Sequence, residues 1–300
     1  MKKAAYLLFY LALAAAIAFL AWRSREALRA IAPGSWALLI PFAALVGVQT
    51  LLSGLANRLV FAGFMEGNSL ADNIRLSLVN AIGNLLPVSL GLVSKGVYAR
   101  KSYGLPLAAF GLLTLWQVGA VLCLSSVTCV VLWLAIPVPG IWPLALVLGA
   151  AAAAGALDLH PWLPARLKAM LDRGEYRRLR ERGLRQYPSQ LGVQALIFLA
   201  SGAKLFLAYR ALGAEPGLGE VFFIYTAVNL SRYVSFTPGG FGIPESVGAA
   251  ISQHFGVPFS ISFLAIALDR ILELVLFMLL VPFMLRPGES SPHPEGGVAA

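Results

Sequence analysis

The chain has 300 residues, of which 59% are hydrophobic and only 12% are charged. Soluble domains carry about 25% charged residues, so this composition excludes an ordinary soluble protein and predicts an integral membrane protein. The net charge of +9 does not indicate nucleic-acid binding, because eight of the 23 basic residues lie together between Arg166 and Arg185.

Apolar runs along the chain predict an all-α polytopic membrane protein with about six full transmembrane helices. The N-terminal run follows two lysines, as in a signal peptide, but it is long and lacks a clear small-residue cleavage site. We therefore interpret it as a retained first helix. The six predicted spans are residues 4–22, 36–56, 107–134, 141–157, 189–209 and 259–285.

The basic residues predict the orientation of the chain in a bacterial inner (plasma) membrane. Because positive residues are retained in the cytoplasm, the N-terminus with Lys2 and Lys3 and the basic 158–188 loop are both predicted to be cytoplasmic. Attraction of this loop to lipid headgroups is a second interpretation of the same charges. Residues 1–286 are expected to form a single transmembrane domain, followed by a disordered polar tail over 287–300.

Comparison of the chain with itself predicts a duplication, with repeat 1 over about 1–134 and repeat 2 over about 138–285. Both repeats contain a long span, a weaker span, a break rich in Pro and Gly, a polar stretch, a G-x-P sequence and another long span. Matching residues include Gly91 with Gly242 and, one insertion later, Pro106 with Pro258.

The weak segments are predicted to form two broken re-entrant hairpins, at roughly 70–103 and 219–256. Each half then has three full spans, an odd number, so the halves form an inverted repeat. Irregular backbone in a membrane survives only where it is buried in protein or lines a wet cavity, and paired breaks are typical of transporter binding sites. Two alternatives remain open: the weak segments cross fully and the halves are parallel, or the Gly and Pro residues form surface turns.

Charged side chains in the predicted spans form the candidate substrate site, because such groups are costly in a membrane and are usually functional or paired. Asp269 and Glu273 share one helix face with Ser262, and Gln117 is the first-half counterpart of Asp269. The charges either meet an ionic headgroup or pair with one another to fix helix packing. The candidate residues are Arg232, Pro238, Gly239, Gly240, Gly242, Glu245, Asp269, Arg270, Glu273, Lys204, Pro87, Gly91, Lys95 and Arg100.

Catalytic motifs are not evident in the sequence. The three histidines are scattered, and neither a G-x-S-x-G elbow nor a phosphate-binding P-loop is present. The sequence therefore predicts no enzyme activity, no cofactor and no metal.

The stretch PGGFGIPES resembles the lysylphosphatidylglycerol synthase transmembrane-region family of flippase-like membrane proteins. The resemblance covers about residues 36–285 and rests on Pro238, Gly239, Gly240, Gly242 and Glu245, with Asn84, Pro87, Gly91 and Arg100 matching a weaker first-half signature. It implies translocation of a lipid without the soluble aminoacyltransferase domain of bifunctional members.

We therefore expect a protein that moves an amphiphilic phospho- or polyprenyl-linked lipid between leaflets. A lipid-modifying enzyme, or a non-translocating subunit of one, is the alternative, and a structural scaffold is a third hypothesis. The expected partners are the lipid substrate and a membrane-associated lipid-modifying enzyme; no nucleic-acid partner is expected.

Overall fold

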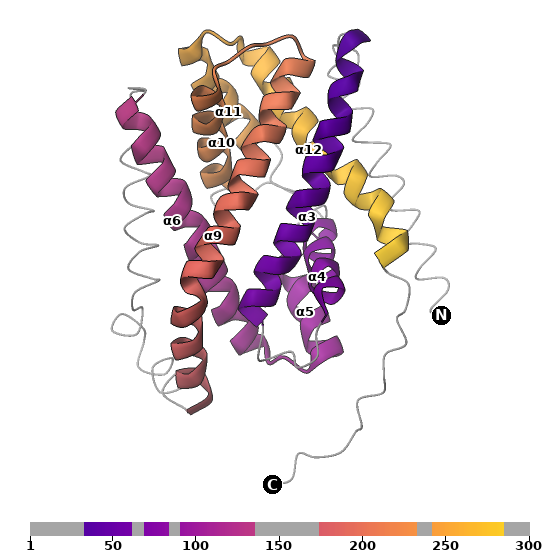
Figure 1. Ribbon diagram of the computed structural model, residues 1–300, viewed down its shortest axis with the longest axis vertical. Helices are drawn as coiled ribbons and strands as arrows, with labels where there is room; N and C mark the ends of the chain where they lie inside the picture. The colour runs from indigo at the N-terminus through magenta and orange to yellow at the C-terminus, as the bar shows by residue number, and fades with distance from the viewer. Residues whose placement is uncertain (1–32, 62–68, 84–90, 136–173, 233–241, 285–300) are drawn as a thin grey trace.

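The protein is helical, apart from short turns, over residues 33–61, 69–83, 91–135, 174–232 and 242–284, which are the residues described by the computed structural model, and no strand occurs in these ranges (Figure 1). The predicted all-α class is therefore confirmed. The elements are η1 (Pro33–Leu38), α3 (Leu39–Phe61), α4 (Leu70–Gly83), α5 (Gly91–Tyr103), α6 (Leu107–Ala135), α9 (Gly174–Ala211), α10 (Leu218–Arg232), α11 (Ile243–Ser252), η4 (Gln253–Phe255) and α12 (Phe259–Met284).

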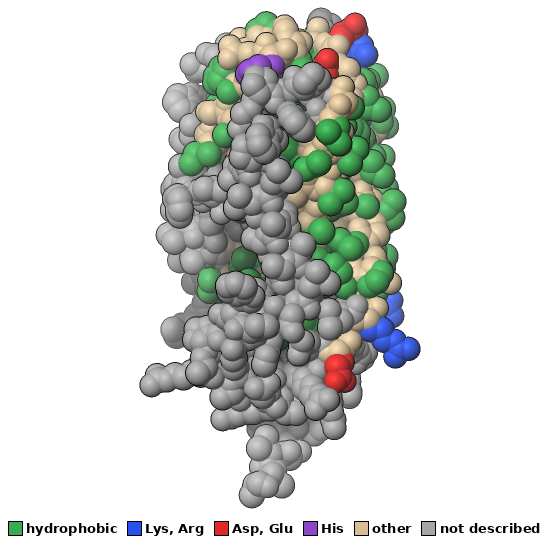
Figure 2. Space-filling view, turned by 90° about the vertical axis from the view of Figure 1, so that its left-hand side faces the viewer, with side chains coloured by type: hydrophobic (Ala, Val, Ile, Leu, Met, Phe, Trp, Pro, Cys, Tyr) green, Lys and Arg blue, Asp and Glu red, His purple; other side chains and the backbone are tan. Residues whose placement is uncertain are grey.

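Three helical stretches of the described residues are apolar enough to cross a membrane: Ser35–Phe61, which joins part of η1 to α3, Ala109–Leu132 in α6 and Arg185–Ala211 in α9. Each exceeds the roughly 20 residues that a bilayer crossing requires. Figure 2 shows a belt of hydrophobic side chains over the described surface, with charged side chains above and below it. The predicted spans at 4–22 and 141–157 lie outside the described residues.

The fourth long helix, α12, has 26 residues and coincides with the predicted span at 259–285. It differs from the other three in carrying Asp269, Arg270 and Glu273 near its middle. One side of α12 faces the protein, since Ser262 is fully buried and Asp269 is 4% exposed, while Leu279 is 62% exposed.

The four short helices form two pairs, with α4 packed on α5 and α10 packed on α11. They contain 14, 13, 15 and 10 residues. At a rise of about 1.5 Å per residue none reaches the ~30 Å of a hydrocarbon core. Figure 1 places the α4–α5 pair toward the lower end of the bundle and the α10–α11 pair toward the upper end.

The long helices of the two halves run in opposite directions. Helices α3 and α9 pack along each other, α3 descending and α9 ascending in the view of Figure 1, and α6 ascends while α12 descends. Each half also has its own apolar core. One core lies among α3, α4, α5 and α6, and the other lies mainly among α9, α10, α11 and α12.

Close helix contacts recur at one spacing in the two halves. Gly54 on α3 lies against Ile74 on α4, and Gly202 on α9 lies against the ring of Phe222 on α10. Each member of the second contact lies 148 residues after its counterpart in the first. A Cβ atom at either glycine would fall well inside van der Waals distance of its neighbour. The absence of a side chain therefore allows each short helix to approach its long helix closely.

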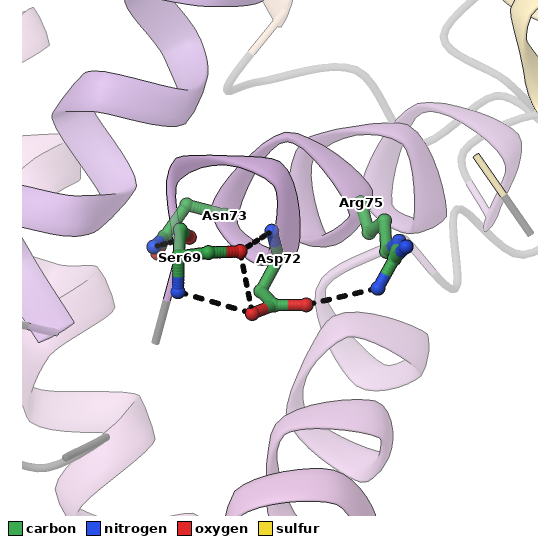
Figure 3. Close-up of polar contacts among 4 residues, drawn as sticks. All are labelled: Ser69, Asp72, Asn73 and Arg75. Atoms are coloured by element: carbon green, nitrogen blue, oxygen red, sulfur yellow. Dashed lines mark hydrogen bonds and ion pairs between the residues drawn. The ribbon is translucent and has the colours of Figure 1, made fainter. Parts of the chain in front are cut away.

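The short helices α4 and α10 also begin in the same way. Ser69 N–H and Oγ both donate to Asp72 Oδ2, at 3.0 and 2.8 Å, and Asp72 N–H donates to Ser69 Oγ at 3.2 Å (Figure 3). At the start of α10, Gly217 N–H donates to Glu220 Oε2 at 2.8 Å, again 148 residues later. A carboxylate three residues into the helix thus satisfies a free backbone N–H in both halves.

The two G-x-P sequences have the same conformation. Gly104 and Gly256 have φ of 68° and 74°, a left-handed conformation that suits glycine. In both halves the Pro lies immediately before a long helix. Its carbonyl oxygen accepts a hydrogen bond from the N–H of the fourth helical residue, which is Phe110 in α6 and Ser262 in α12. These positions are 152 residues apart in the sequence.

One boundary differs from the sequence prediction. Helix α9 begins at Gly174 and has 38 residues, so its first 15 residues continue into the segment that was predicted to be a basic loop over 158–188. The Arg, Leu and Glu residues of this segment favour a helix, and hydrophobicity alone marks only the part that lies within lipid. At about 1.5 Å per residue, α9 is far longer than a bilayer is thick, so its basic end projects beyond the hydrocarbon region.

Candidate functional site

Lys204 on α9 is the centre of a charged cluster in the second half. Its Nζ lies 2.9 Å from Glu273 Oε2 and 3.7 Å from Asp269 Oδ1, both on α12. The lysine side chain is 1% exposed, and its Nζ lies 5.7 Å from the centre of the Phe42 ring. The acids at positions 269 and 273 reach the same lysine because residues four apart share a helix face.

Glu273 also binds the first half of the chain. Gln49 on α3 donates from Nε2 to Glu273 Oε1 at 3.0 Å, so the two carboxylate oxygens bind partners on two different helices. Gln49 was not among the predicted site residues. The available signal was an amide side chain within the otherwise apolar run at 36–56.

Glu245 joins helix α11 to α12. Its Oε2 accepts the Gly242 N–H at 2.6 Å at the start of α11, and its Oε1 accepts a hydrogen bond from Arg270 Nη1. Gly242 has φ of 98°, which a side chain would strain. Glu245 is 1% exposed, so this carboxylate is buried with both a backbone donor and a counter-charge.

Arg232, at the end of α10, completes the second-half cluster. It interacts electrostatically with Glu273, Asp269 and Glu245. Its buried Nε has no hydrogen-bond partner among the residues that the structure describes. The second-half cluster thus contains three cations and three carboxylates: Arg232, Lys204, Arg270, Glu245, Asp269 and Glu273.

A second polar cluster lies in the first half, around Lys95 on α5. Its Nζ donates to Asn57 Oδ1 on α3 at 2.8 Å and to Gln117 Oε1 on α6 at 3.5 Å. The face of the Phe61 ring is 5.2 Å from Nζ, and Lys95 is 4% exposed. Asn57 was missed in the sequence, where one Asn near the end of a span carries little signal.

The remaining predicted site residues are dispersed. Gly91 is buried as the first residue of α5, whereas Arg100 lies on the same helix with an exposed side chain and does not reach Lys95. Pro87, Pro238, Gly239 and Gly240 lie outside the described residues. The structure therefore brings together Lys204, Glu245, Asp269, Arg270, Glu273 and Arg232 in one cluster and places Lys95 in another.

The arrangement is suited to binding ions and polar groups by exchange of partners. Within the described ranges no three His, Cys, Asp or Glu side chains come together as metal ligands. The clusters consist of charged and amide side chains, most of which have a partner on a different helix. A headgroup that supplied the charge of a displaced partner would keep the remaining side chain paired.

Comparison with known proteins gives one match. The model of the family described as the lysylphosphatidylglycerol synthase TM region matches residues 7–280. No curated protein and no solved structure matches the chain. The match extends over both halves and both polar clusters, and it agrees with the apolar helices in indicating a membrane-embedded protein. The chain therefore belongs to the lysylphosphatidylglycerol synthase transmembrane-region family.

Proposed function

We propose that this protein moves an amphiphilic phospho- or polyprenyl-linked lipid between the leaflets of a bacterial inner membrane. The observation that carries the proposal is the second-half cluster, six ionisable side chains, of which Lys204, Glu245 and Asp269 are buried, among helices whose outer faces are apolar. Charged groups at membrane depth are costly and mark substrate or ion pathways. Membership of a family named for lipid chemistry supports a lipid as the substrate.

The architecture that we propose has six full spans and two re-entrant hairpins related by an inverted repeat. The short helices of the α4–α5 and α10–α11 pairs and their positions toward opposite ends of the bundle support it. The recurrence of Gly54 at Gly202, and of Gly104 at Gly256, supports a common origin for the two halves. Opposed hairpins of this kind frame midplane binding sites in other transporters.

The orientation follows from the distribution of basic residues. We propose that the N-terminus and the basic 158–188 segment lie in the cytoplasm, because positively charged residues near spans are retained there. The basic end of α9 would then extend from the bilayer into the cytoplasm. A membrane-associated lipid-modifying enzyme on that side would supply or consume the lipid.

The energetic role of the clusters is to replace water around the headgroup. A charged headgroup that crosses bare hydrocarbon loses its hydration at a cost of many kcal/mol. Side chains such as Lys204, Arg270 and Glu245 would offset this cost by exchanging an internal partner for the headgroup, while the acyl chains remain in lipid. The chain itself would catalyse no covalent change.

The test is a leaflet assay in proteoliposomes. Lipid with a fluorescent headgroup is reconstituted with the purified protein, and an impermeant quencher reports the fraction in the outer leaflet over time. We expect protein-dependent redistribution of unchanged lipid that is abolished by Glu245→Gln and retained by Lys101→Met, an exposed lysine on α5. A lipid product of altered mass would favour the enzyme hypothesis, and unchanged redistribution in Glu245→Gln would favour a scaffold role for the cluster.

A further inference from the structure

The two polar clusters differ in charge balance. In the second half, Lys204 has two carboxylates within 4 Å and Arg270 has Glu245. In the first half, the partners of Lys95 among the described residues are the amide oxygens of Asn57 and Gln117 and one aromatic face. No carboxylate in the described part of the chain forms an ion pair with Lys95, although its side chain is almost fully buried.

The surroundings of Lys95 are arranged for a charged ammonium group. Asn57 donates from Nδ2 to Asn73 O at 3.1 Å and to Ser77 Oγ at 2.7 Å, so its amide is held with Oδ1 toward Lys95. Gln117 also presents Oε1 to Nζ. Two carbonyl oxygens and the negative face of a ring surround a group that has three donors and, when charged, no acceptor.

The counter-charge that Lys95 lacks among the described residues is present at the corresponding position of the second repeat. With the spacing of 152 residues that relates the two G-x-P sequences, Gln117 on α6 corresponds to Asp269 on α12. The second half thus has a carboxylate 3.7 Å from its buried lysine, and the first half has a neutral amide 3.5 Å from its own. An uncompensated buried ammonium is unfavourable, and a ligand anion would remove that cost.

We infer that Lys95 is the docking point for a single anionic group, a phosphoryl or carboxylate oxygen, of the lipid that the protein moves. This inference rests on the proposed function and assigns the anionic part of the substrate to the first half, since the second-half cluster neutralises itself. Gln117 is the partner that the anion replaces, because its hydrogen bond to Nζ is the longer of the two. Gln117 Nε2 donates to Asn57 Oδ1 at 3.4 Å, and once the amide is released from Nζ it can rotate and exchange this long bond for one from Nε2 to the same anion.

The experiment measures binding and does not depend on transport. The delipidated protein in neutral detergent is titrated with phosphatidylglycerol, with diacylglycerol, which lacks the phosphoryl group, or with inorganic phosphate, and thermal unfolding is followed. We expect phosphatidylglycerol alone to raise the melting temperature of the wild type. Lys95→Met should weaken the apparent affinity about tenfold or more, as expected for loss of a charge-assisted hydrogen bond.

Gln117→Glu provides a second test that does not remove the lysine. A carboxylate at this position supplies an internal counter-charge, so the lipid-free protein should melt at a higher temperature and lose its response to phosphatidylglycerol. Lys101→Met, on the exposed side of α5, should respond like the wild type. Native mass spectrometry should show phosphatidylglycerol bound to the wild type and to Lys101→Met, and depleted from the other two variants.

Three results would overturn the inference. Unchanged phosphatidylglycerol affinity in both Lys95→Met and Gln117→Glu would leave Lys95 without a ligand role. An equal response to diacylglycerol would show that the acyl chains alone are recognised, and an equal response to inorganic phosphate would assign the site to a soluble anion. Absence of lipid movement in proteoliposomes, by contrast, would contradict the proposed function while leaving a positive binding result intact.

Discussion

Lys204 and Glu273, 69 residues apart in the sequence, form an ion pair between α9 and α12 with Nζ and Oε2 separated by 2.9 Å, in which the lysine is fully buried. Because Gln49 of α3 donates to the other oxygen of Glu273, this carboxylate links the two halves of the chain. Helix α3 carries Asn57 two turns further on, where it contacts Lys95. A rearrangement at one cluster can therefore be transmitted to the other through a single helix.

Replacing Lys204 by Met should destabilise the protein strongly. The substitution removes the cation closest to Glu273 and Asp269, and breaking a buried pair in this way costs up to about 3–5 kcal/mol. Thermal unfolding in detergent measures the loss. Lys204→Met combined with Glu273→Gln should be less destabilised than the sum of the single variants, because the two substitutions remove one interaction. Strict additivity would show that the pair contributes nothing as a unit.

Two substitutions of Glu245 separate its two contacts. Glu245→Gln retains an oxygen that can accept the Gly242 N–H but loses the charge that binds Arg270, whereas Glu245→Ala loses both. We expect Glu245→Ala to be the less stable variant by about 1 kcal/mol, the usual contribution of a helix-capping hydrogen bond. Thermal unfolding of both variants, with the leaflet assay alongside, tests this order. Equal stability would mean that the contact at Gly242 has no energetic role.

Glycine substitutions test the close helix contacts. Gly54→Ala and Gly202→Ala place a methyl group into Ile74 and into the Phe222 ring, so each should lower stability by about 1–3 kcal/mol, as overpacking does. Gly47 and Gly192 lie on the same two helices, and a methyl group at either position would meet nothing within 4 Å. Their alanine variants should be neutral or more stable by up to about 1 kcal/mol. Destabilisation of all four to the same extent would rule out close packing as the cause.

The residue before α4 can be tested by comparison with the residue at the same position before α10. Ser69→Ala removes the hydroxyl that accepts the Asp72 N–H and should cost about 1 kcal/mol, measured by thermal unfolding. Ser69→Gly should cost only a few tenths of a kcal/mol, because glycine is itself a good N-cap and because Gly217 occupies the corresponding position before α10. The prediction is wrong if the glycine variant is as unstable as the alanine variant.

The helices and the charged residues could be predicted from the sequence because both depend on local composition. Long apolar runs predicted α3, α6, the membrane part of α9, and α12. The weak segments with their breaks rich in Gly and Pro predicted re-entrant hairpins at 70–103 and 219–256, where the structure has the pairs α4–α5 and α10–α11. The basic start of α9 was assigned to a loop because a polar helix outside the membrane has no hydrophobic signature.

The partners within the site could not be predicted in the same way. From the sequence, Arg270 can reach Glu273 along its own helix. In the tertiary structure Arg270 donates to Glu245 on α11, and Glu273 accepts hydrogen bonds from Lys204 and Gln49. Asn57 and Gln49 carry no charge and gained a role only when α3 packed beside the clusters. Which charge meets which depends on the distance between helices, and helix spacing depends on small-residue contacts such as Gly202 with Phe222.

The sequence by itself determined that this chain enters a membrane, where its long apolar helices lie and which ionisable groups it carries into the apolar region, because hydropathy and backbone propensity act over a few neighbouring residues. Only the tertiary structure decided that the second-half charges balance one another while Lys95 is left with neutral partners. Coulomb energy depends on separations of a few ångströms between atoms on different helices, and such separations exist only after the helices have packed.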